Sequence, residues 1–165
     1  MVAPQHARER RPEGARTERL AWIDLHTGLG PSGAGERIYA GRKDEAAVAR
    51  ARNWWGQKIT SIDDGSSSSA PLTGLMWSAV YDECPQAEYT GIALEYGTQS
   101  LRQVMNALRA DQWLANHPQH LGARGPQIKQ QIRDAFYTDT DAWKRRVVAQ
   151  ATEAAAQAVQ GLVRN

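Results

Sequence analysis

Residues 89–96, Y-T-G-I-A-L-E-Y, form the stretch that decides the fold. Its centre, Ile92-Ala93-Leu94, is apolar toward both faces of an extended chain. Strands of parallel sheets that are covered on both sides have this pattern. The stretch therefore predicts a buried parallel strand with Glu95 at its carboxyl end.

Working outward, a second strand is predicted from residues 20–25, L-A-W-I-D-L, which lead straight into a histidine. The glycines between Gly28 and Gly35 predict a loop. Residues 36–40 and 59–62 are predicted as further short strands. The strands alternate with helical patterns, and the chain ends in helices, so we expect the α/β class, with a partial mixed sheet and flanking helices.

The predicted helices carry recognisable start and stop signals, and the clearest begins with the capping-box pair Ser100 and Gln103. Its apolar stripe is expected to face the core and consists of Leu101, Val104, Met105 and Leu108. The helices are expected over residues 44–55, 72–83, 100–116, 127–137 and 139–161.

The chain has 165 residues, which is the length of one domain or of a piece of a larger one. Residues 1–19 are polar and predict a tail or the remnant of a surface helix. Residues 20–165 are expected to form the folded portion. Residues 63–69, two aspartates, a glycine and four serines, are interpreted as a solvated loop, with a lid as the alternative.

The net charge of +2 comes from 20 basic and 18 acidic residues, and the excess lies in residues 1–19. A nucleic-acid partner is not expected, because such proteins concentrate basic residues on one face. We expect no membrane partner and a cytoplasmic protein, since we find neither a secretory signal nor an apolar run of about 20 residues. The single cysteine, Cys84, excludes an internal disulfide and a cysteine zinc module.

Two strand ends carry groups that can do chemistry. His26 follows the strand predicted at residues 20–25, and Glu95 lies at the carboxyl end of the strand predicted at residues 89–96. Ligands of open α/β sheets bind at the carboxyl ends of strands, so parallel neighbours would bring these residues together. Asp24, two residues before His26, points to the same face and can orient the imidazole. Alternatively, loop backbone satisfies His26, and an arginine pairs with Glu95.

These residues resemble a known family. Residues 21–31, A-W-I-D-L-H-T-G-L-G-P, resemble the third-ligand region of bacterial zinc carboxypeptidase-like proteins, in the domain-of-unknown-function branch of the metallocarboxypeptidase superfamily. Residues 94–98, L-E-Y-G-T, resemble the strand of their catalytic glutamate. Residues 107–114 and the pair Phe136-Tyr137 fit the same C-terminal half, and the resemblance covers about residues 18–160.

The resemblance implies a zinc-dependent hydrolase of amide or peptide bonds. By this resemblance His26 is the third zinc ligand and Glu95 is the general base. The family's other two ligands lie in an upstream H-x-x-E element, yet only 25 residues precede His26. The formal match His6-Ala-Arg-Glu9 is interpreted as surface helix. We therefore expect the C-terminal half of such an enzyme, with an incomplete zinc site that is inactive alone.

Several alternatives stay open at this stage. A zinc deacylase of N-acyl amino acids would use a similar site. A non-catalytic remnant or assembly module would instead use the incomplete sheet to bind an N-terminal half or a second copy. His117 and His120 predict a helix-ending turn rather than a metal pair, and nothing in the sequence decides which arginine would bind a substrate carboxylate. Candidates are Arg102, Arg109 and Arg124.

Overall fold

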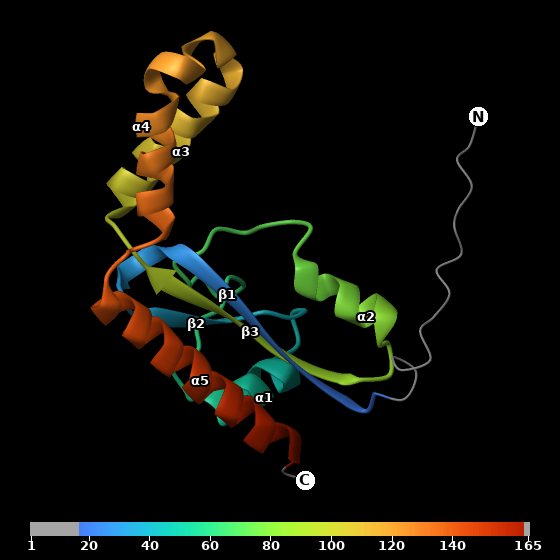
Figure 1. Ribbon diagram of the computed structural model, residues 1–165. Coiled ribbons are helices and arrows are strands. Elements are labelled where there is room, and N and C mark those ends of the chain that lie inside the picture. The colour runs from blue at the N-terminus through green and yellow to red at the C-terminus, as the bar shows by residue number, and fades with distance from the viewer. Residues whose placement is uncertain (1–16, 164–165) are drawn as a thin grey trace, which may run out of the picture.

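The computed structural model describes residues 17–163 as an α/β unit (Figure 1). Within that range the sheet is mixed and has three strands in the order β1-β3-β2. The central strand is β3 (Glu88–Gly97), with β1 (Arg19–Ser32) parallel on one side and β2 (Gly35–Tyr39) antiparallel on the other. The predicted class, a partial mixed sheet with flanking helices, is confirmed.

Two helices cover one face of this sheet. They are α1 (Glu45–Trp55) and α5 (Asp141–Val163). The core between sheet and helices consists of Ile92, Leu94 and Tyr96 from β3 with Ala51, Trp55, Trp143, Ala154 and Ala158 from the helices. Both buried indole N–H groups have main-chain partners. Trp55 donates to the carbonyl of Ala154 and Trp143 to that of Gly97, each at 2.9 Å.

The opposite face is covered only in part. The chain between Thr60 and Glu83 crosses it and ends in the short helices η2 (Met76–Ala79) and α2 (Val80–Glu83). A cavity remains beneath this segment. The sequence predicts that both faces of β3 are covered. This is fully so only on the face that packs against α1 and α5.

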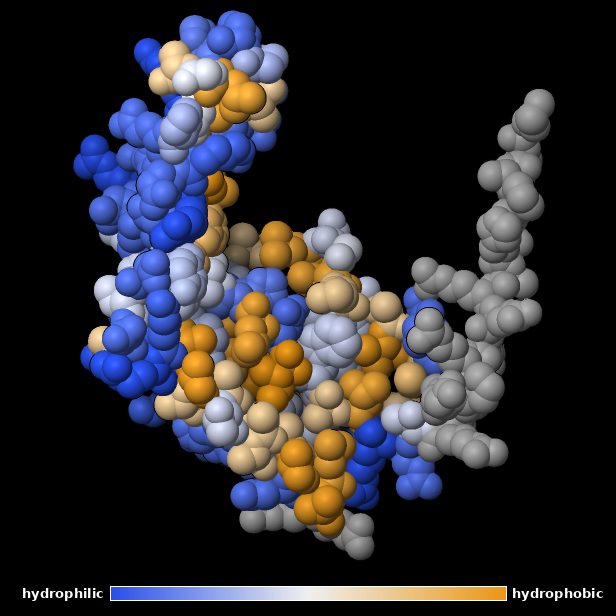
Figure 2. Space-filling model, viewed as in Figure 1, coloured by the Kyte–Doolittle hydropathy of each residue, from blue (hydrophilic) through white to orange (hydrophobic). Residues whose placement is uncertain are grey.

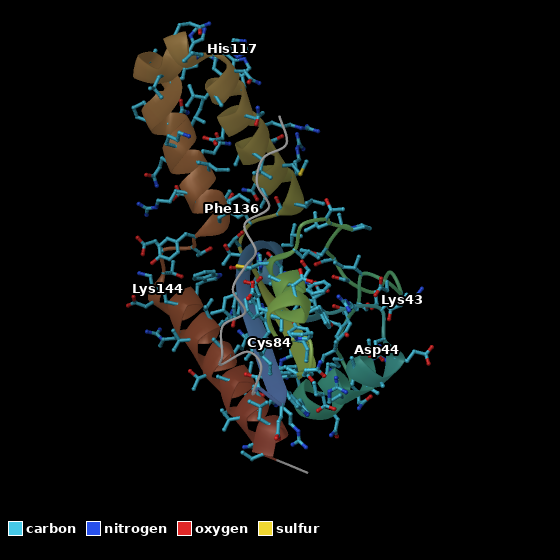
Figure 3. All side chains as sticks on the ribbon, turned by 90° about the vertical axis from the view of Figure 1, so that its right-hand side faces the viewer. Lys43, Asp44, Cys84, His117, Phe136 and Lys144 are labelled. Carbon is cyan, nitrogen blue, oxygen red and sulfur yellow. The ribbon has the colours of Figure 1, made fainter. Side chains whose placement is uncertain are left out.

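A helical hairpin rises from the carboxyl end of β3 (Figure 1). It consists of α3 (Leu101–Asn116), η3 (Pro118–His120) and α4 (Leu121–Phe136). Threonine side chains tie the last carbonyls of α4 to the strands: Thr98 donates to Ala135 at 2.6 Å, and Thr27 donates to Phe136 at 2.7 Å. The base of the hairpin, where Phe136 lies, is thus fixed beside the ends of β1 and β3, and His117 lies at the far end (Figure 3).

Most predicted elements are present near their expected bounds. The strands at 20–25 and 89–96 are parallel neighbours, which is the condition under which their ends meet. Asp44 caps α1 by accepting from the backbone N–H groups of the first turn, and the Ser100–Gln103 capping box is formed. The boundary of the predicted tail shifts slightly, because β1 begins at Arg19.

Several sequence predictions are wrong. The predicted loop from Gly28 to Gly35 is largely strand, because β1 continues to Ser32, where it pairs with Gly97. The strand predicted at 59–62 is a single bridge at Thr60, since Ser66 binds the backbone of Ser61 and turns the chain.

The bounds of two predicted helices also change. The helix predicted from Leu72 starts at Met76, because Gly74 has a positive φ of 72° that does not belong in a helix. The helix predicted from Gln127 starts at Leu121, because η3 leads straight into it, and it passes through Pro126.

The predicted core stripe of α3 is mostly not in the core. Val104 is buried against α4, but Leu101, Met105 and Leu108 are exposed. The predicted helix is present, but the hairpin stands away from the sheet, so one side of the stripe faces a cavity.

A tight backbone crossing at the end of β3 sets the course of β1. The register between these strands runs regularly to Thr27↔Tyr96 and then skips to Ser32↔Gly97. A Cβ at Gly97 would lie 2.2 Å from the carbonyl oxygens of Gly30 and Pro31. No side chain fits there, so this position requires glycine.

Replacing Gly97 with alanine should therefore destabilise the protein. We expect Gly97→Ala to lower the free energy of unfolding by about 2–3 kcal/mol, because backbone atoms must move to admit the methyl group. Urea unfolding followed by circular dichroism measures this. Gly122→Ala in α4 is the control, since nothing lies within 4 Å of its Cβ position. An equal response of both variants would contradict the packing argument.

Candidate functional site

The pairing of strands places three ionisable side chains in one row across the sheet. His26 of β1 and Glu36 of β2 both lie opposite Glu95 of β3 in the register. Paired residues in a sheet point to the same face. All three therefore lie on the face away from α1 and α5.

Glu95 is the most enclosed member of this row. Glu95 is only 8% exposed, and its Oε1 accepts a hydrogen bond from the backbone N–H of Leu29 at 2.9 Å. Burial raises the pKa of Glu95 above its ordinary value, although the Leu29 N–H and the nearby His26 act in the opposite direction. A carboxyl group of this kind is suited to accept a proton near neutral pH.

The break in the register of β1 brings the Leu29 N–H to Glu95. Between Thr27 and Ser32 the strand bulges, and Gly28 has a φ of +139° that few side chains permit. The ring of Phe136 lies against the same glycine, 2.8 Å from the position of a Cβ. The glycines that predicted a loop thus shape the strand around the carboxylate instead.

His26 and Asp24 form a pair beside Glu95. The Nε2 atom of His26 lies 2.9 Å from Oδ2 of Asp24, as expected from their positions two residues apart on β1. His26 is 53% exposed at its side chain, whereas Asp24 is 22% exposed. The carboxylate accepts from Nε2, which leaves Nδ1 of a neutral imidazole as the nitrogen with a free lone pair.

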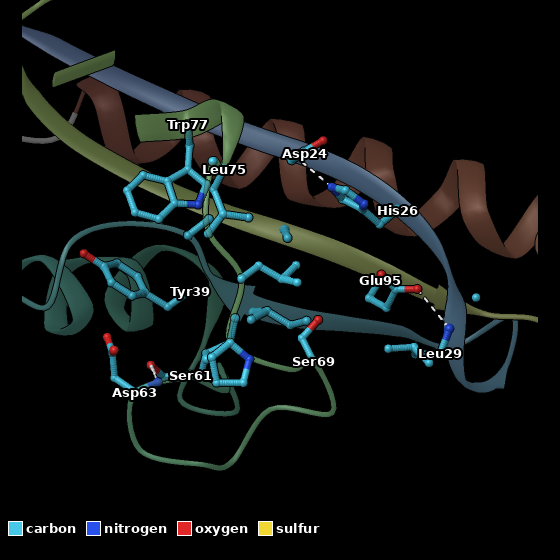
Figure 4. A pocket seen from close by; sticks show the side chains of 18 of the residues that line it. Asp24, His26, Leu29, Tyr39, Ser61, Asp63, Ser69, Leu75, Trp77 and Glu95 are labelled. Atoms are coloured by element: carbon cyan, nitrogen blue, oxygen red, sulfur yellow. Dashed lines mark hydrogen bonds and ion pairs between the residues drawn. The ribbon is translucent and has the colours of Figure 1, made fainter. Parts of the chain in front are cut away.

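A cavity of about 660 Å³ contains these side chains (Figure 4). Figure 4 shows Glu95 and His26 on neighbouring strands, with Leu75 and Trp77 at one side and Tyr39 with Asp63 at another. The cavity is of the size that holds a small ligand. Its wall is mostly apolar, and Asp24, His26 and Glu95 on the sheet form its floor.

Glu36 has a structural part in this row. Its carboxylate accepts from the hydroxyl of Thr60 at 2.6 Å, and from the backbone N–H of Ser68 at 3.1 Å and the Ser68 hydroxyl. Burial acts to raise the pKa of Glu36, but these hydrogen bonds outweigh it and lower the pKa overall. The serine loop, interpreted from sequence as solvated, is therefore pinned to β2 and forms one wall through Ser69.

Positive charge lies at the other end of the cavity. Among the described residues that line it, the arginine and lysine side chains are those of Arg42 and Lys43. The Arg42 guanidinium lies over the ring of Tyr81, 3.9 Å from its centre. The three arginines considered from sequence do not line the cavity, and Arg124 lies instead over Trp113 on the hairpin.

The described residues do not make a zinc site by themselves. A catalytic zinc centre needs three protein ligands, and within residues 17–163 no group of three His, Cys, Asp or Glu side chains is placed to hold a metal. His6 and Glu9 lie outside the described residues. His117 and His120 instead stack on Trp113, with ring centroids 4.6 and 5.1 Å away, in the turn that the sequence predicted.

Comparison with protein families assigns the chain. Residues 9–150 match the family described as "Protein of unknown function (DUF2817)". The chain belongs to the DUF2817 family. The matched region contains Asp24, His26 and Glu95 together with the other described residues that line the cavity. Searches of curated proteins and of solved structures found no significant match. No helix within the described range is long and apolar enough to span a membrane.

The sequence predicted Asp24, His26 and Glu95 as site residues, and the structure brings them together. The sequence made no prediction for the Leu29 N–H or for Glu36, which both lie beside Glu95. The Leu29 N–H is a backbone group, and only the unusual density of glycines around it hinted at a special conformation. Glu36 carries no sequence signal, because its importance comes from its position opposite Glu95. The alternative in which an arginine pairs with Glu95 is not seen among the described residues, since its hydrogen bond comes from Leu29.

The raised pKa of Glu95 predicts a specific pH dependence of stability. Between the ordinary pKa of 4.5 and the higher value in the folded protein, the folded state binds more protons than the unfolded one. The free energy of unfolding therefore falls as pH rises through this range. In Glu95→Gln this contribution is absent, so the wild-type protein should lose stability relative to the variant from pH 4.5 toward neutrality. Urea titrations at several pH values measure the difference, and a difference that grows in favour of wild type would contradict the burial argument.

Proposed function

We propose that this DUF2817 chain carries the general-base half of a carboxypeptidase-like hydrolase of amide or peptide bonds. In this proposal Glu95 is the base and His26 is one ligand of a zinc ion. The remaining ligands come from polypeptide outside the described residues, in accord with the resemblance of residues 21–31 and 94–98 to zinc carboxypeptidase-like proteins.

The observation that carries the proposal is the environment of Glu95. A carboxyl group is costly to bury unless it is paired or used, and this one has a backbone N–H as its hydrogen-bond partner. It lies on the floor of a cavity, one strand away from a histidine that a carboxylate orients. Structural ion pairs do not require a cavity of this size above them.

The residues of this chain would act as follows. The carboxylate of Glu95 accepts a proton from a water molecule as that water attacks the substrate carbonyl, and it then transfers the proton to the departing amine. The Leu29 N–H holds one carboxylate oxygen, so the other is left to face the water. Asp24 keeps the ring of His26 in a single tautomer and orientation.

The strand that carries His26 also has an open edge. In a parallel ladder, alternate residues of a strand direct both their N–H and C=O groups toward the same neighbouring strand. The Glu88 N–H donates to the carbonyl of Glu18 at 2.8 Å, and this bond shows which residues of β1 face β3. The backbone groups of even-numbered residues of β1 therefore point toward β3, and those of Ala21, Ile23 and Leu25 point away from it. Within the described residues no strand pairs with this edge.

Apolar side chains accompany the open edge. Figure 2 shows apolar residues gathered where β1 runs between α5 and α2. Leu25 is 54% exposed, and the exposed valines of α5 include Val148 and Val159. An unpaired strand with an apolar border is a site for a further strand. The missing ligands and the missing strand thus concern the same element, and we propose that one added segment supplies both.

A non-catalytic assembly module is the second candidate, and the open edge of β1 favours it. In that case the chain binds an N-terminal half or a second copy through β1 without turning over a substrate. A zinc deacylase of N-acyl amino acids uses the same site as the peptidase and differs only in its substrate. The DNA immediately upstream discriminates the two classes: an H-x-x-E element after an apolar strand indicates the enzyme.

The catalytic proposal predicts separable effects of two substitutions in the chain assembled with its ligand-bearing segment. We expect Glu95→Gln to lower the rate of amide hydrolysis by about 100- to 10,000-fold, because a general base is lost, while one zinc per complex is retained. His26→Ala should lose both zinc and activity. Metal analysis and a peptide-hydrolysis assay measure these effects, and the chain alone, which should hold well under one zinc, is the control. Normal turnover by Glu95→Gln would overturn the proposed role.

The open edge predicts concentration-dependent association that a proline blocks. The N–H of Ala21 points away from β3, so Ala21→Pro should leave the β1–β3 ladder intact and prevent pairing at the outer edge. We expect the wild-type chain to associate in light scattering coupled to gel filtration, and Ala21→Pro to stay monomeric. Ala21→Thr, which keeps the N–H, is the matched control. Equal association of all three would exclude β1 as the edge used.

A further inference from the structure

One wall of the cavity is an apolar stripe on α3. Leu101, Met105 and Leu108 are 63%, 41% and 43% exposed, and all three line the cavity. Their spacing of four and three residues places them on one side of the helix. At a rise of about 1.5 Å per residue, the stripe is about 10 Å long.

The stripe is held in place from behind. Val104, which flanks the stripe and also lines the cavity, and Ala107 are buried against Ala135 of α4. The base of the hairpin is tied to the strands by the bonds of Thr27 and Thr98 to the end of α4. α3 therefore cannot turn to bury the stripe without separating the hairpin. The exposed leucines and methionine are a fixed feature of the cavity.

The stripe starts beside the proposed catalytic carboxylate. Only five residues separate Glu95 from Leu101, which begins α3 directly after β3. Phe136, at the end of α4, also lines the cavity and packs against Gly28 next to Glu95. A molecule whose reacting bond lies over Glu95 can thus extend its next atoms straight along α3.

No positive charge accompanies this wall among the described lining residues. Arg42 and Lys43 follow β2 beyond Tyr39, which lies opposite Ile92, three residues from Glu95 along β3. The chain that carries both cations therefore begins about 10 Å from Glu95. An anionic group on the stripe would be desolvated without a partner, whereas an uncharged chain would not.

We propose that the α3 stripe binds the aliphatic acyl chain of an N-acylated substrate, with its amide bond over Glu95. This inference rests on the proposed function for the position of the amide, but the binding of the acyl chain does not require hydrolysis. The straight stripe, two helical turns long, fits a medium-length alkyl chain better than the branched side chain of one residue. An apolar peptide side chain is the other source of the same chemistry, and the test separates the two.

The test measures binding by isothermal titration calorimetry to the chain as it exists, which needs no complete active site. The probes are the N-acetyl, N-butanoyl and N-octanoyl derivatives of glycinamide. A fully buried methylene strengthens binding about four-fold. Because the wall is open on one side, we expect about 100-fold tighter binding of the octanoyl than of the acetyl compound. A further probe is the glycinamide derivative whose eight-carbon acyl group ends in a carboxylate. It should bind at least about ten-fold more weakly than the octanoyl compound.

The variant Met105→Gln/Leu108→Gln tests the wall itself. Glutamine is a good helix former of similar length, and both positions are exposed, so the fold should persist, which circular dichroism checks. We expect the variant to lose most of the dependence on chain length. Leu121→Gln is the matched control, because Leu121 is 55% exposed on the hairpin yet does not line the cavity.

The outcomes distinguish this inference from the proposed function. Binding that does not strengthen with chain length, or an unchanged slope in the double variant, overturns the acyl-chain site. N-acetyl-leucinamide binding as tightly as the octanoyl compound assigns the wall to a peptide side chain and overturns the inference as well. Octanoyl binding without amide hydrolysis by the assembled protein leaves the acyl site standing and removes the hydrolase.

Discussion

Pairing between β1 and β3 brings the two chemical groups of the site together, because it sets His26 opposite Glu95 across 69 residues of sequence. The pairing depends in turn on the burial of Ile92, Leu94 and Tyr96 beneath α1 and α5. Apolar side chains on one face of β3 hold the sheet in register. The same register presents Glu95 on the opposite face, where a cavity remains beneath the segment from Thr60 to Glu83.

The backbone around Glu95 determines the environment of its carboxylate. The crossing of β1 over Gly97 forces the strand out of register after Thr27, and the resulting bulge turns the Leu29 N–H toward Glu95. Burial and the hydrogen bond act on the pKa in opposite directions, and burial dominates. Glu95 is thus a buried carboxyl group with a raised pKa, near Gly97, where the main chain permits no larger residue.

The proposed zinc site and the sheet are both incomplete at β1 among the described residues. This strand supplies the imidazole, which lacks companion metal ligands among the described residues, and it also has the open edge of the sheet. In the proposed function, one neighbouring segment accounts for both properties. The proposed hydrolase and the proposed assembly module share this neighbour and differ in whether it brings metal ligands. The α3 wall, by contrast, is complete within the chain, since its rear face packs against α4.

Local patterns in the sequence determined the elements that depend on short-range rules. The two main strands, the capped start of α1 and the Ser100–Gln103 box follow from residues within a few positions of one another. Asp24, His26 and Glu95 could be proposed as site residues for the same reason, because strand ends and a two-residue alternation are local. All three residues lie within residues 9–150, the part that matches the DUF2817 family.

Tertiary structure alone decided what faces the cavity. Periodicity located the stripe Leu101–Leu108 but not its surroundings, because an apolar stripe looks the same whether a core or an open cavity lies against it. The glycines of residues 28–35 showed that the backbone is unusual there, while the crossing at Gly97 made that segment a strand. Glu36 gained its role from its register with Glu95. These features depend on contacts between distant segments, and no local pattern encodes such contacts.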